Sequence, residues 1–190
     1  PRFTCIRNTV KKYALENIVH GINALEPEDE DVIVTLDGDD WFADEHVLDR
    51  VKREYETTGC MMTYGSFQEY PSGKLSNFIS EFPDSVKLFN LYRKAGWRSS
   101  HLRTFFYRVW KQIKDEDLRD SDGRYYKVTW DLAFMFPMLE ICDGQAAYIS
   151  DVIYIYNLKI MDSSFVLFDL WTLELLIFDL KIGFYVKFPP

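Results

Sequence analysis

Cysteine is scarce in this sequence, and its few copies are far apart. Cys5, Cys60 and Cys142 form no C-x-x-C pair. This spacing predicts neither a disulfide framework nor a zinc knuckle. Free thiols are typical of a reducing compartment, so we expect the chain to be cytoplasmic.

An excess of positive charge is also missing. Lys and Arg number 22 against 30 Asp and Glu, which gives a net charge of -8. Such a surface repels a phosphate backbone unless its basic residues segregate strongly. We therefore expect no nucleic acid among the partners of this protein.

Long uncharged hydrophobic runs are absent as well. The most apolar segment, residues 158–190, is interrupted by Asp169, Glu174 and Asp179, whereas a membrane span needs about 20 apolar residues. Residues 1–30 carry no basic and then apolar signal segment. We expect no transmembrane span and no secretion. The tail, residues 158–190, is expected to pack on the domain or on a partner, either a second copy of the chain or a membrane surface.

What the sequence does contain is typical of one globular domain with a substantial core. Hydrophobic residues make up 47% of the 190 residues and charged residues 27%, and a chain of this length buries roughly 70% of its unfolded surface. We assign residues 1–157 to the domain and residues 158–190 to the extension. Aromatic residues are frequent, and Trp97 and Trp130 are expected to pack in the core, although aromatic faces can also stack on the ring of a ligand.

Helical and strand patterns alternate through the first third of the chain. Apolar residues recur at three- and four-residue steps over residues 9–25 and again over residues 45–57. Between and after these helices, residues 32–36 and 60–64 are continuous apolar runs typical of buried strands. Alternation at these lengths predicts an α/β fold with a mostly parallel sheet that is covered by helices on both faces.

An acidic turn follows the first of these strands. Residues 37–40 read Asp-Gly-Asp-Asp, and ligands of open α/β sheets bind beyond the carboxyl ends of the strands. Neighbouring carboxylates repel one another unless a cation neutralises them. Mg²⁺ and Mn²⁺ prefer oxygen ligands, so Asp37, Asp39 and Asp40 are candidate metal ligands. The alternative is a solvated loop in which Asp40 or Asp44 caps the next helix.

Two other metal-binding motifs match the sequence around the acidic turn poorly. An EF-hand loop requires an acidic or amide residue where this chain has Trp41, and glycine where it has Phe42,. Phosphatases with an aspartyl nucleophile also place D-x-D after a strand, but they call for a small residue at the position of Trp41. A metal-dependent phosphatase or nucleotidyltransferase remains the alternative enzyme.

In these segments the sequence resembles glycosyltransferase family 2, whose members have the GT-A fold. The resemblance is carried by residues 13–18, 31–42, 100–105, 130–131 and 154–157. It implies a GT-A-like, Rossmann-like domain that transfers a sugar from a nucleoside-diphosphate sugar to an acceptor hydroxyl, with inversion. The acceptor could be a glycan, a protein or a small molecule.

The resemblance also assigns roles to individual residues. Asp37 would lie near the ribose and the metal, Asp39 would be the principal ligand of Mn²⁺ or Mg²⁺, and Asp40 would support the turn. Asp131 matches the general base, although a carboxylate in the first turn of a helix can also serve only to cap it.

Three further side chains are candidates for contact with the nucleotide sugar. Asn17 lies on the apolar side of the first expected helix, where an amide either satisfies backbone groups or contacts a ligand. His101 and Arg103 could reach the diphosphate or the metal, Arg103 through paired hydrogen bonds.

Two departures from the family pattern bear on function. The family opens with a strand and loop that hold the nucleotide base, and we expect this first strand to be absent here, which leaves donor binding open. The Q-x-x-R-W signature of processive members is missing too, so we expect one sugar per encounter. A non-catalytic domain of the same fold, which binds a partner through its tail, is the contrasting hypothesis.

Overall fold

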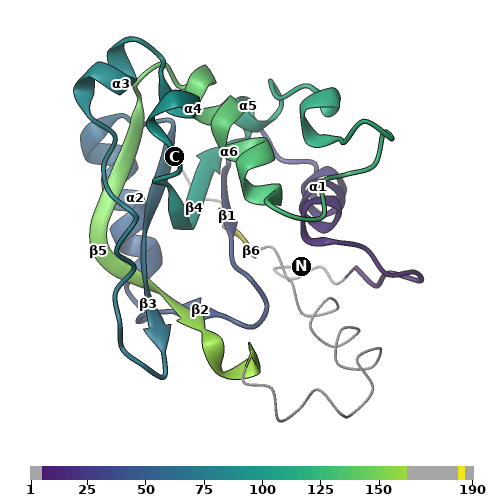
Figure 1. The fold of residues 1–190 in the computed structure, drawn as a ribbon, viewed down its shortest axis with the longest axis horizontal. Helices are drawn as coiled ribbons and strands as arrows, with labels where there is room; N and C mark the ends of the chain where they lie inside the picture. The colour runs from purple at the N-terminus through teal and green to yellow at the C-terminus, as the bar shows by residue number, and fades with distance from the viewer. Residues whose placement is uncertain (1–5, 162–183, 187–190) are drawn as a thin grey trace.

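A computed structural model describes residues 6–161 and 184–186 of the chain. Its centre is a six-stranded sheet with helices on both faces (Figure 1). The strands are β1 (Val32–Thr35), β2 (Trp41–Phe42), β3 (Met62–Tyr70), β4 (Ser100–Phe106), β5 (Ala146–Asn157) and β6 (Phe184–Val186). Their spatial order is β2-β5-β3-β4-β1-β6.

Six α-helices and two 3-10 helices surround the sheet in the described part of the chain. The α-helices are α1 (Ala14–Leu25), α2 (Val47–Thr58), α3 (Asp84–Leu88), α4 (Tyr92–Ala95), α5 (Tyr107–Trp110) and α6 (Trp130–Ile141). The 3-10 helices are η1 (Asp115–Leu118) and η2 (Leu158–Met161). The mixed α/β class expected from the sequence is therefore confirmed.

The expectation of a mostly parallel sheet is wrong. Only β3 and β5 pair in parallel, whereas β4 pairs antiparallel with both β1 and β3, and the pairs β1–β6 and β2–β5 are antiparallel too. Strands β1, β3 and β5 still run in one direction, as helical crossovers require. The difference arises because β4 enters between β1 and β3 in the opposite direction, and because β2 and β6 add antiparallel strands at the two edges.

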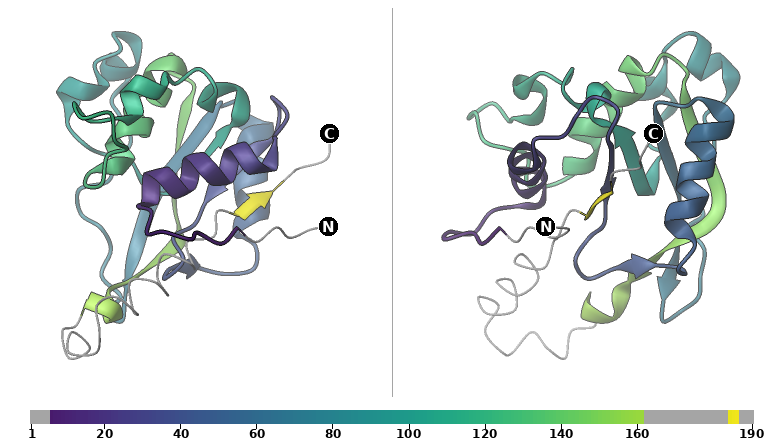
Figure 2. Two further views of the ribbon diagram at one scale, coloured as in Figure 1. Left: turned by 90° about the vertical axis from the view of Figure 1, so that its right-hand side faces the viewer. Right: turned by 180° about the vertical axis from the view of Figure 1, so that it is seen from behind.

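Two hydrophobic clusters cover the two faces of the sheet. One contains Ile33 and Phe105 of the sheet with residues from α1, α4, α5 and α6. The other contains Val32 and Val34 with Val51 of α2. Figure 2 shows α2 on the opposite side of the sheet from α1 and α6. All four residues of β1 are buried, in agreement with the strand expected from its β-branched sequence.

Several element boundaries differ from the expected ones. The periodic segment at residues 9–25 is helical only from Ala14. The strand expected at residues 60–64 extends to Tyr70, because it pairs along most of its length with β5. Helix α2 ends at Thr58, and Gly59 after it adopts a left-handed conformation with φ 66°, which glycine accepts readily,.

The tail lies largely outside the described residues. Within it, β6 pairs with β1 at the edge of the sheet, while the contact of this tail with a second copy of the chain remains a prediction. Among the described residues, no helix has the length and apolar character needed to cross a membrane.

At Gly65 of β3, backbone atoms of both neighbouring strands, β4 and β5, lie close by. A Cβ atom at this position would lie 3.1 Å from the carbonyl oxygen of His101 and 3.3 Å from that of Ile149. Both neighbours are backbone atoms of β4 and β5, so they cannot move aside as a flexible side chain would. The registers of β3 with both neighbours shift beside this residue.

We therefore expect Gly65→Ala to lower the free energy of unfolding by about 1–3 kcal/mol, the usual cost of overpacking. Urea denaturation measures this change. Gly21→Ala is the matched control, because a Cβ atom at Gly21 meets nothing within 4 Å and alanine favours a helix by about 1 kcal/mol. Equal effects of the two substitutions would contradict the close approach at Gly65.

Candidate functional site

The acidic turn lies at the carboxyl end of β1, as the sequence predicts. The backbone N–H of Asp40 donates to the carbonyl oxygen of Asp37 at 3.0 Å, which closes a four-residue turn,. Strand β2 then begins at Trp41 and pairs with β5. The turn is thus held between β1 and β5. Asp37 and Asp39 are half-buried, whereas Asp40 is 9% exposed.

Asp40 supports the turn through hydrogen bonds to β5. Its Oδ2 accepts a hydrogen bond from the Tyr154 hydroxyl at 2.6 Å, and its Oδ1 accepts one from the Asn157 backbone N–H at 2.8 Å. The Asn157 side chain also donates to the carbonyl oxygen of Asp39 at 3.0 Å. Both carboxylate oxygens of Asp40 are engaged within the fold, so Asp40 fits the supporting role better than that of a metal ligand.

Burial raises the pKa of Asp40 from 3.8 to about 6. The hydrogen bonds from Asn157 and Tyr154 oppose this rise, and the charges of Asp39 and Asp37 add to it. The turn therefore concentrates negative charge at a partly desolvated position, which a cation would relieve.

This pKa leads to a prediction about pH and stability. A carboxyl group whose pKa is higher in the folded state binds more protons there, so wild-type stability falls as the pH rises from about 4 to about 6. Asn at position 40 can accept from the Asn157 backbone N–H through its carbonyl oxygen, and its amide N–H can donate to the Tyr154 hydroxyl, without the charge,. We expect Asp40→Asn to be more stable than wild type at pH 7, by about 2–3 kcal/mol. Urea denaturation at pH 4 and pH 7 tests this difference, and an equal advantage at both pH values would contradict it.

Tyr154 connects the acidic turn to His101 of β4. The Tyr154 hydroxyl accepts a hydrogen bond from the backbone N–H of Asp37 at 3.4 Å. Its ring stacks on the imidazole of His101 with a centroid separation of 4.4 Å. Burial raises the pKa of Tyr154 far above its ordinary value, with further contributions from the charges of Asp37 and Asp40. Tyr154 therefore remains protonated and can donate to Asp40.

Arg103 continues this series of contacts toward α6. Its guanidinium nitrogens Nη1 and Nη2 lie 3.1 and 3.2 Å from the two ring nitrogens of His101. Nη2 also donates to Oδ2 of Asp131 at 3.1 Å, and the guanidinium lies 5.4 Å from the ring centre of Trp130. Contacts thus run without a break from Asp40 through Tyr154, His101 and Arg103 to Asp131.

The residues at the turn can be tested against the requirements of a metal ion. In the described residues, no three Asp, Glu, His or Cys side chains are grouped closely enough to surround a metal ion. A Mg²⁺ or Mn²⁺ ion that acts on a diphosphate usually takes only one or two protein carboxylates, and phosphate oxygens and water complete its shell. Asp37 and Asp39 equal that number of carboxylates, and metal binding at the turn together with a diphosphate remains a prediction.

Asn17 is separate from this group of contacts. It lies on α1, where its side-chain oxygen accepts a hydrogen bond from Asn8 at 2.8 Å, and its amide nitrogen is buried with no partner among the described residues. Helix α1 packs beside α6. No contact recorded within the described residues joins Asn17 to the acidic turn, so its role in nucleotide binding remains a prediction.

The two tryptophans that could stack on the ring of a ligand pack against other aromatic side chains. Trp97 lies edge-on to Phe136 with centroids 5.6 Å apart, and Trp130 stacks on Phe134 at 6.0 Å.

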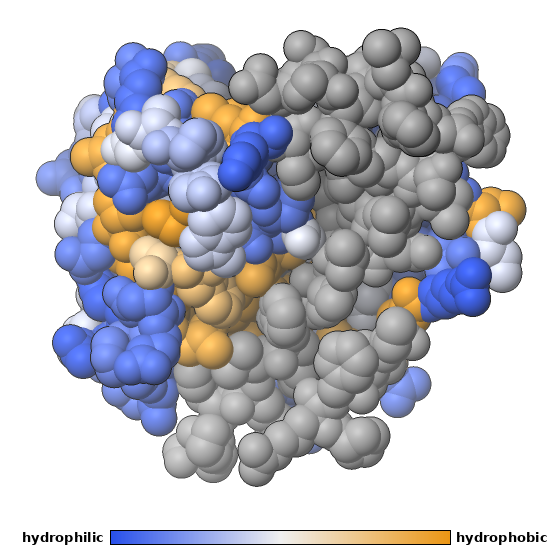
Figure 3. Space-filling view, turned by 90° about the horizontal axis from the view of Figure 1, so that it is seen from below, coloured by the Kyte–Doolittle hydropathy of each residue, from blue (hydrophilic) through white to orange (hydrophobic). Residues whose placement is uncertain are grey.

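Apolar side chains also reach the surface, and Figure 3 shows a strip of them on the underside of the molecule. The large hydrophobic side chains that are exposed include Trp41, Tyr70, Leu75 and Phe78.

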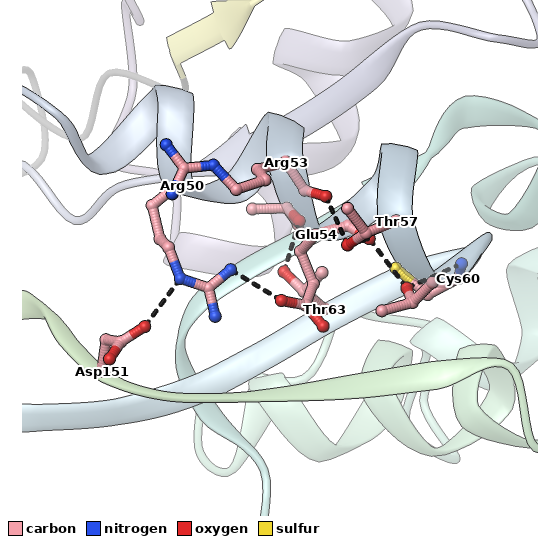
Figure 4. A network of polar contacts seen from close by, with 9 residues as sticks. Arg50, Arg53, Glu54, Thr57, Cys60, Thr63 and Asp151 are labelled. Atoms are coloured by element: carbon pink, nitrogen blue, oxygen red, sulfur yellow. Dashed lines mark hydrogen bonds and ion pairs between the residues drawn. The ribbon is translucent and has the colours of Figure 1, made fainter.

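A shallow depression of about 300 Å³ lies away from these contacts, at the start of α2. Its lining carries both acidic and basic side chains. One of the basic residues, Arg50, is paired with Asp151 at 2.6 Å and with Glu54 at 2.6 Å (Figure 4). The depression therefore offers no concentrated charge to a ligand.

Tyr154 and Asn157 were not among the site residues selected from the sequence. Both lie on β5, more than 100 residues from the turn that they hold. The sequence signal was the Tyr-Ile-Tyr-Asn segment at the end of a strand, whose alternating tyrosines face one side of a sheet. The pairing of β2 with β5, which brings this segment to the turn, could not be predicted from the sequence.

Comparison with known proteins adds no relative to this description. No protein-family model matches the chain, and no curated protein sequence matches it either.

Proposed function

We propose that this chain is a metal-dependent glycosyltransferase domain of the GT-A type. It would transfer one sugar from a nucleoside-diphosphate sugar to an acceptor hydroxyl, with inversion at the anomeric carbon. The observation that carries the proposal is the unbroken series of contacts between the acidic turn and Asp131, two sites more than 90 residues apart in the sequence.

Each side chain in this series has a role in the proposed reaction. Asp37 and Asp39 would hold a Mn²⁺ or Mg²⁺ ion, which would stabilise the negative charge that develops on the departing diphosphate. Asp40 fixes the turn. Arg103 offers the planar donor group that pairs well with phosphate oxygens.

Asp131 would act as the general base. Its carboxylate would accept the proton of the acceptor hydroxyl while the acceptor oxygen forms a bond to the anomeric carbon. The bond from that carbon to the diphosphate oxygen breaks, and its electron pair leaves with the diphosphate. The side chain of Asp131 is 21% exposed, so a substrate hydroxyl can reach it.

The test is an incubation of the chain with a panel of nucleoside-diphosphate sugars, with and without Mn²⁺. Many transferases slowly hydrolyse their donor, so we expect Mn²⁺-dependent release of the free sugar and the nucleoside diphosphate. Release of inorganic phosphate, with phosphorylation of Asp37, would favour the phosphatase alternative instead. The absence of any reaction and of any nucleotide affinity, together with a concentration-dependent dimer, would favour a non-catalytic binding domain.

A further inference from the structure

Arg103 and Asp131 form an ion pair at the boundary between the protein interior and the solvent. The Arg103 side chain is 3% exposed, whereas that of Asp131 is 21% exposed. A buried guanidinium requires a nearby negative charge, because burial without one is costly. Asp131, which is more exposed to solvent than Arg103, supplies this negative charge.

The hydrogen-bonding capacity of Arg103 is not used completely. A guanidinium carries five N–H donors. Its two terminal nitrogens lie beside His101 and Asp131, but its Nε is buried and has no acceptor among the described residues. A ligand that moved the guanidinium could place an oxygen beside Nε. This oxygen would accept the unused N–H and remove the free-energy cost of burying it without a partner.

The same pair conflicts with the role of Asp131 as a base. Oδ2 accepts a hydrogen bond from Arg103 at 3.1 Å, and Oδ1 accepts one from the backbone N–H of Leu132 at 3.1 Å. A general base needs an oxygen that can receive the substrate proton within hydrogen-bonding distance. Each carboxylate oxygen has a second lone-pair site, but the charge-assisted hydrogen bond from Arg103 competes with the substrate proton for Oδ2,. An anion that takes the guanidinium can replace this bond.

We propose that Arg103 is shared between Asp131 and the diphosphate of the donor. The diphosphate takes the guanidinium, because two phosphate oxygens can accept its parallel N–H groups, and Oδ2 of Asp131 is released to accept the acceptor's proton. This inference rests on the proposed function and deepens it. Donor binding would thereby activate the base, and the donor would bind before the acceptor.

Removal of a residue that binds an anion would weaken anion binding, but the exchange predicts that removal of the Asp131 carboxylate strengthens it. If Asp131 competes with the anion for Arg103, its removal should strengthen anion binding. We expect Asp131→Asn to bind inorganic pyrophosphate roughly five- to tenfold more tightly than wild type, the effect of losing one competing charge-assisted hydrogen bond. Arg103→Gln should lose this affinity.

Titration calorimetry with inorganic pyrophosphate, without metal, measures these affinities. Asp151→Asn is the matched control, because it also removes the carboxylate partner of an arginine, Arg50, away from the site (Figure 4); its pyrophosphate affinity should equal that of wild type. An affinity of folded Asp131→Asn equal to or weaker than wild type would overturn the exchange. An undiminished affinity of Arg103→Gln would overturn it as well.

A measurement on wild type keeps the inference testable if Asp131→Asn does not fold. The Nε–H resonance of Arg103, identified by its loss in Arg103→Lys, should shift when pyrophosphate is added, and an unchanged resonance at saturating pyrophosphate would overturn the exchange. Failure of the exchange can be distinguished from failure of the proposed function. If Asp131→Asn binds pyrophosphate more tightly but the chain shows no Mn²⁺-dependent nucleotide binding, the glycosyltransferase proposal alone is rejected. If the chain binds nucleotides but Asp131→Asn does not strengthen this binding, the exchange alone is rejected.

Discussion

Replacement of Asp131 by Asn is expected to lower the rate of sugar transfer by about 10²–10⁴-fold, the usual contribution of a general base. The Asn side chain keeps the shape of Asp131 and can still accept a hydrogen bond from Arg103, but it cannot take up the acceptor's proton. Steady-state transfer assays with saturating donor measure this change.

The control separates catalysis from helix capping. Asp131 lies in the first turn of α6, and Asp49 lies in the first turn of α2. A carboxylate at this position stabilises a helix by about 0.3–1 kcal/mol, so Asp49→Asn should lose about that much stability. Asp131→Asn should lose more, because the buried Arg103 also loses its carboxylate partner,. Only Asp131→Asn should lose activity. Equal activity of the two variants would reduce Asp131 to a capping residue.

Asp39→Ala is the second substitution with a large expected effect. Asp39 is half-buried in the acidic turn, and its backbone carbonyl, which accepts from Asn157, is unchanged by the substitution. We therefore expect the turn to keep its shape and the affinity for Mn²⁺ in the presence of a nucleoside diphosphate to fall by about 100-fold or more. Loss of even an outer-shell partner costs about 10–100-fold. Titration calorimetry measures the affinity.

Asp44→Ala is the control for Asp39. The Asp44 side chain accepts a hydrogen bond from the backbone N–H of His46 at 2.7 Å, next to the start of α2. Its loss should cost about 0.5–1.5 kcal/mol of stability, the usual net contribution of one hydrogen bond, and leave Mn²⁺ affinity at the wild-type level. A similar loss of Mn²⁺ affinity in both variants would show that the effect is one of overall charge and not of ligation.

The parts of the fold that local sequence patterns determine were predicted well. The branched residues of β1 and the glycine that ends α2 indicate these elements directly, because their signals lie within the elements themselves. The place of the acidic turn after β1 follows from the same local signals.

Strand direction and long-range pairing could not be predicted in this way. Nothing in residues 100–106 indicates that β4 runs antiparallel between β1 and β3, since an antiparallel and a parallel buried strand share the same residue types. Helices α3 and α4 are separated by a short break, in which Asn90 has a φ of 51°. Asparagine adopts a left-handed backbone more readily than most other residues, so Asn90 is a local signal for this break, unlike the direction of β4.

The candidate site shows the same division. His101, Arg103 and Asp131 were selected by residue type and by resemblance, and the structure brings them into direct contact. Their connection to the turn through Tyr154 depends on the stacking of one ring on His101 and on a hydrogen bond across 114 positions of the sequence. Sequence spacing alone does not contain that information.

The central claim is that the acidic turn binds a divalent cation together with a nucleoside diphosphate. A thermal-shift panel of nucleoside diphosphates, with and without Mn²⁺, tests it most directly, because a ligand that binds the folded state raises the melting temperature. We predict that at least one nucleoside diphosphate raises the Tm of wild type only when Mn²⁺ is present, and that Asp39→Ala abolishes this rise. No rise with any nucleoside diphosphate, or the same rise in Asp39→Ala, would contradict the claim.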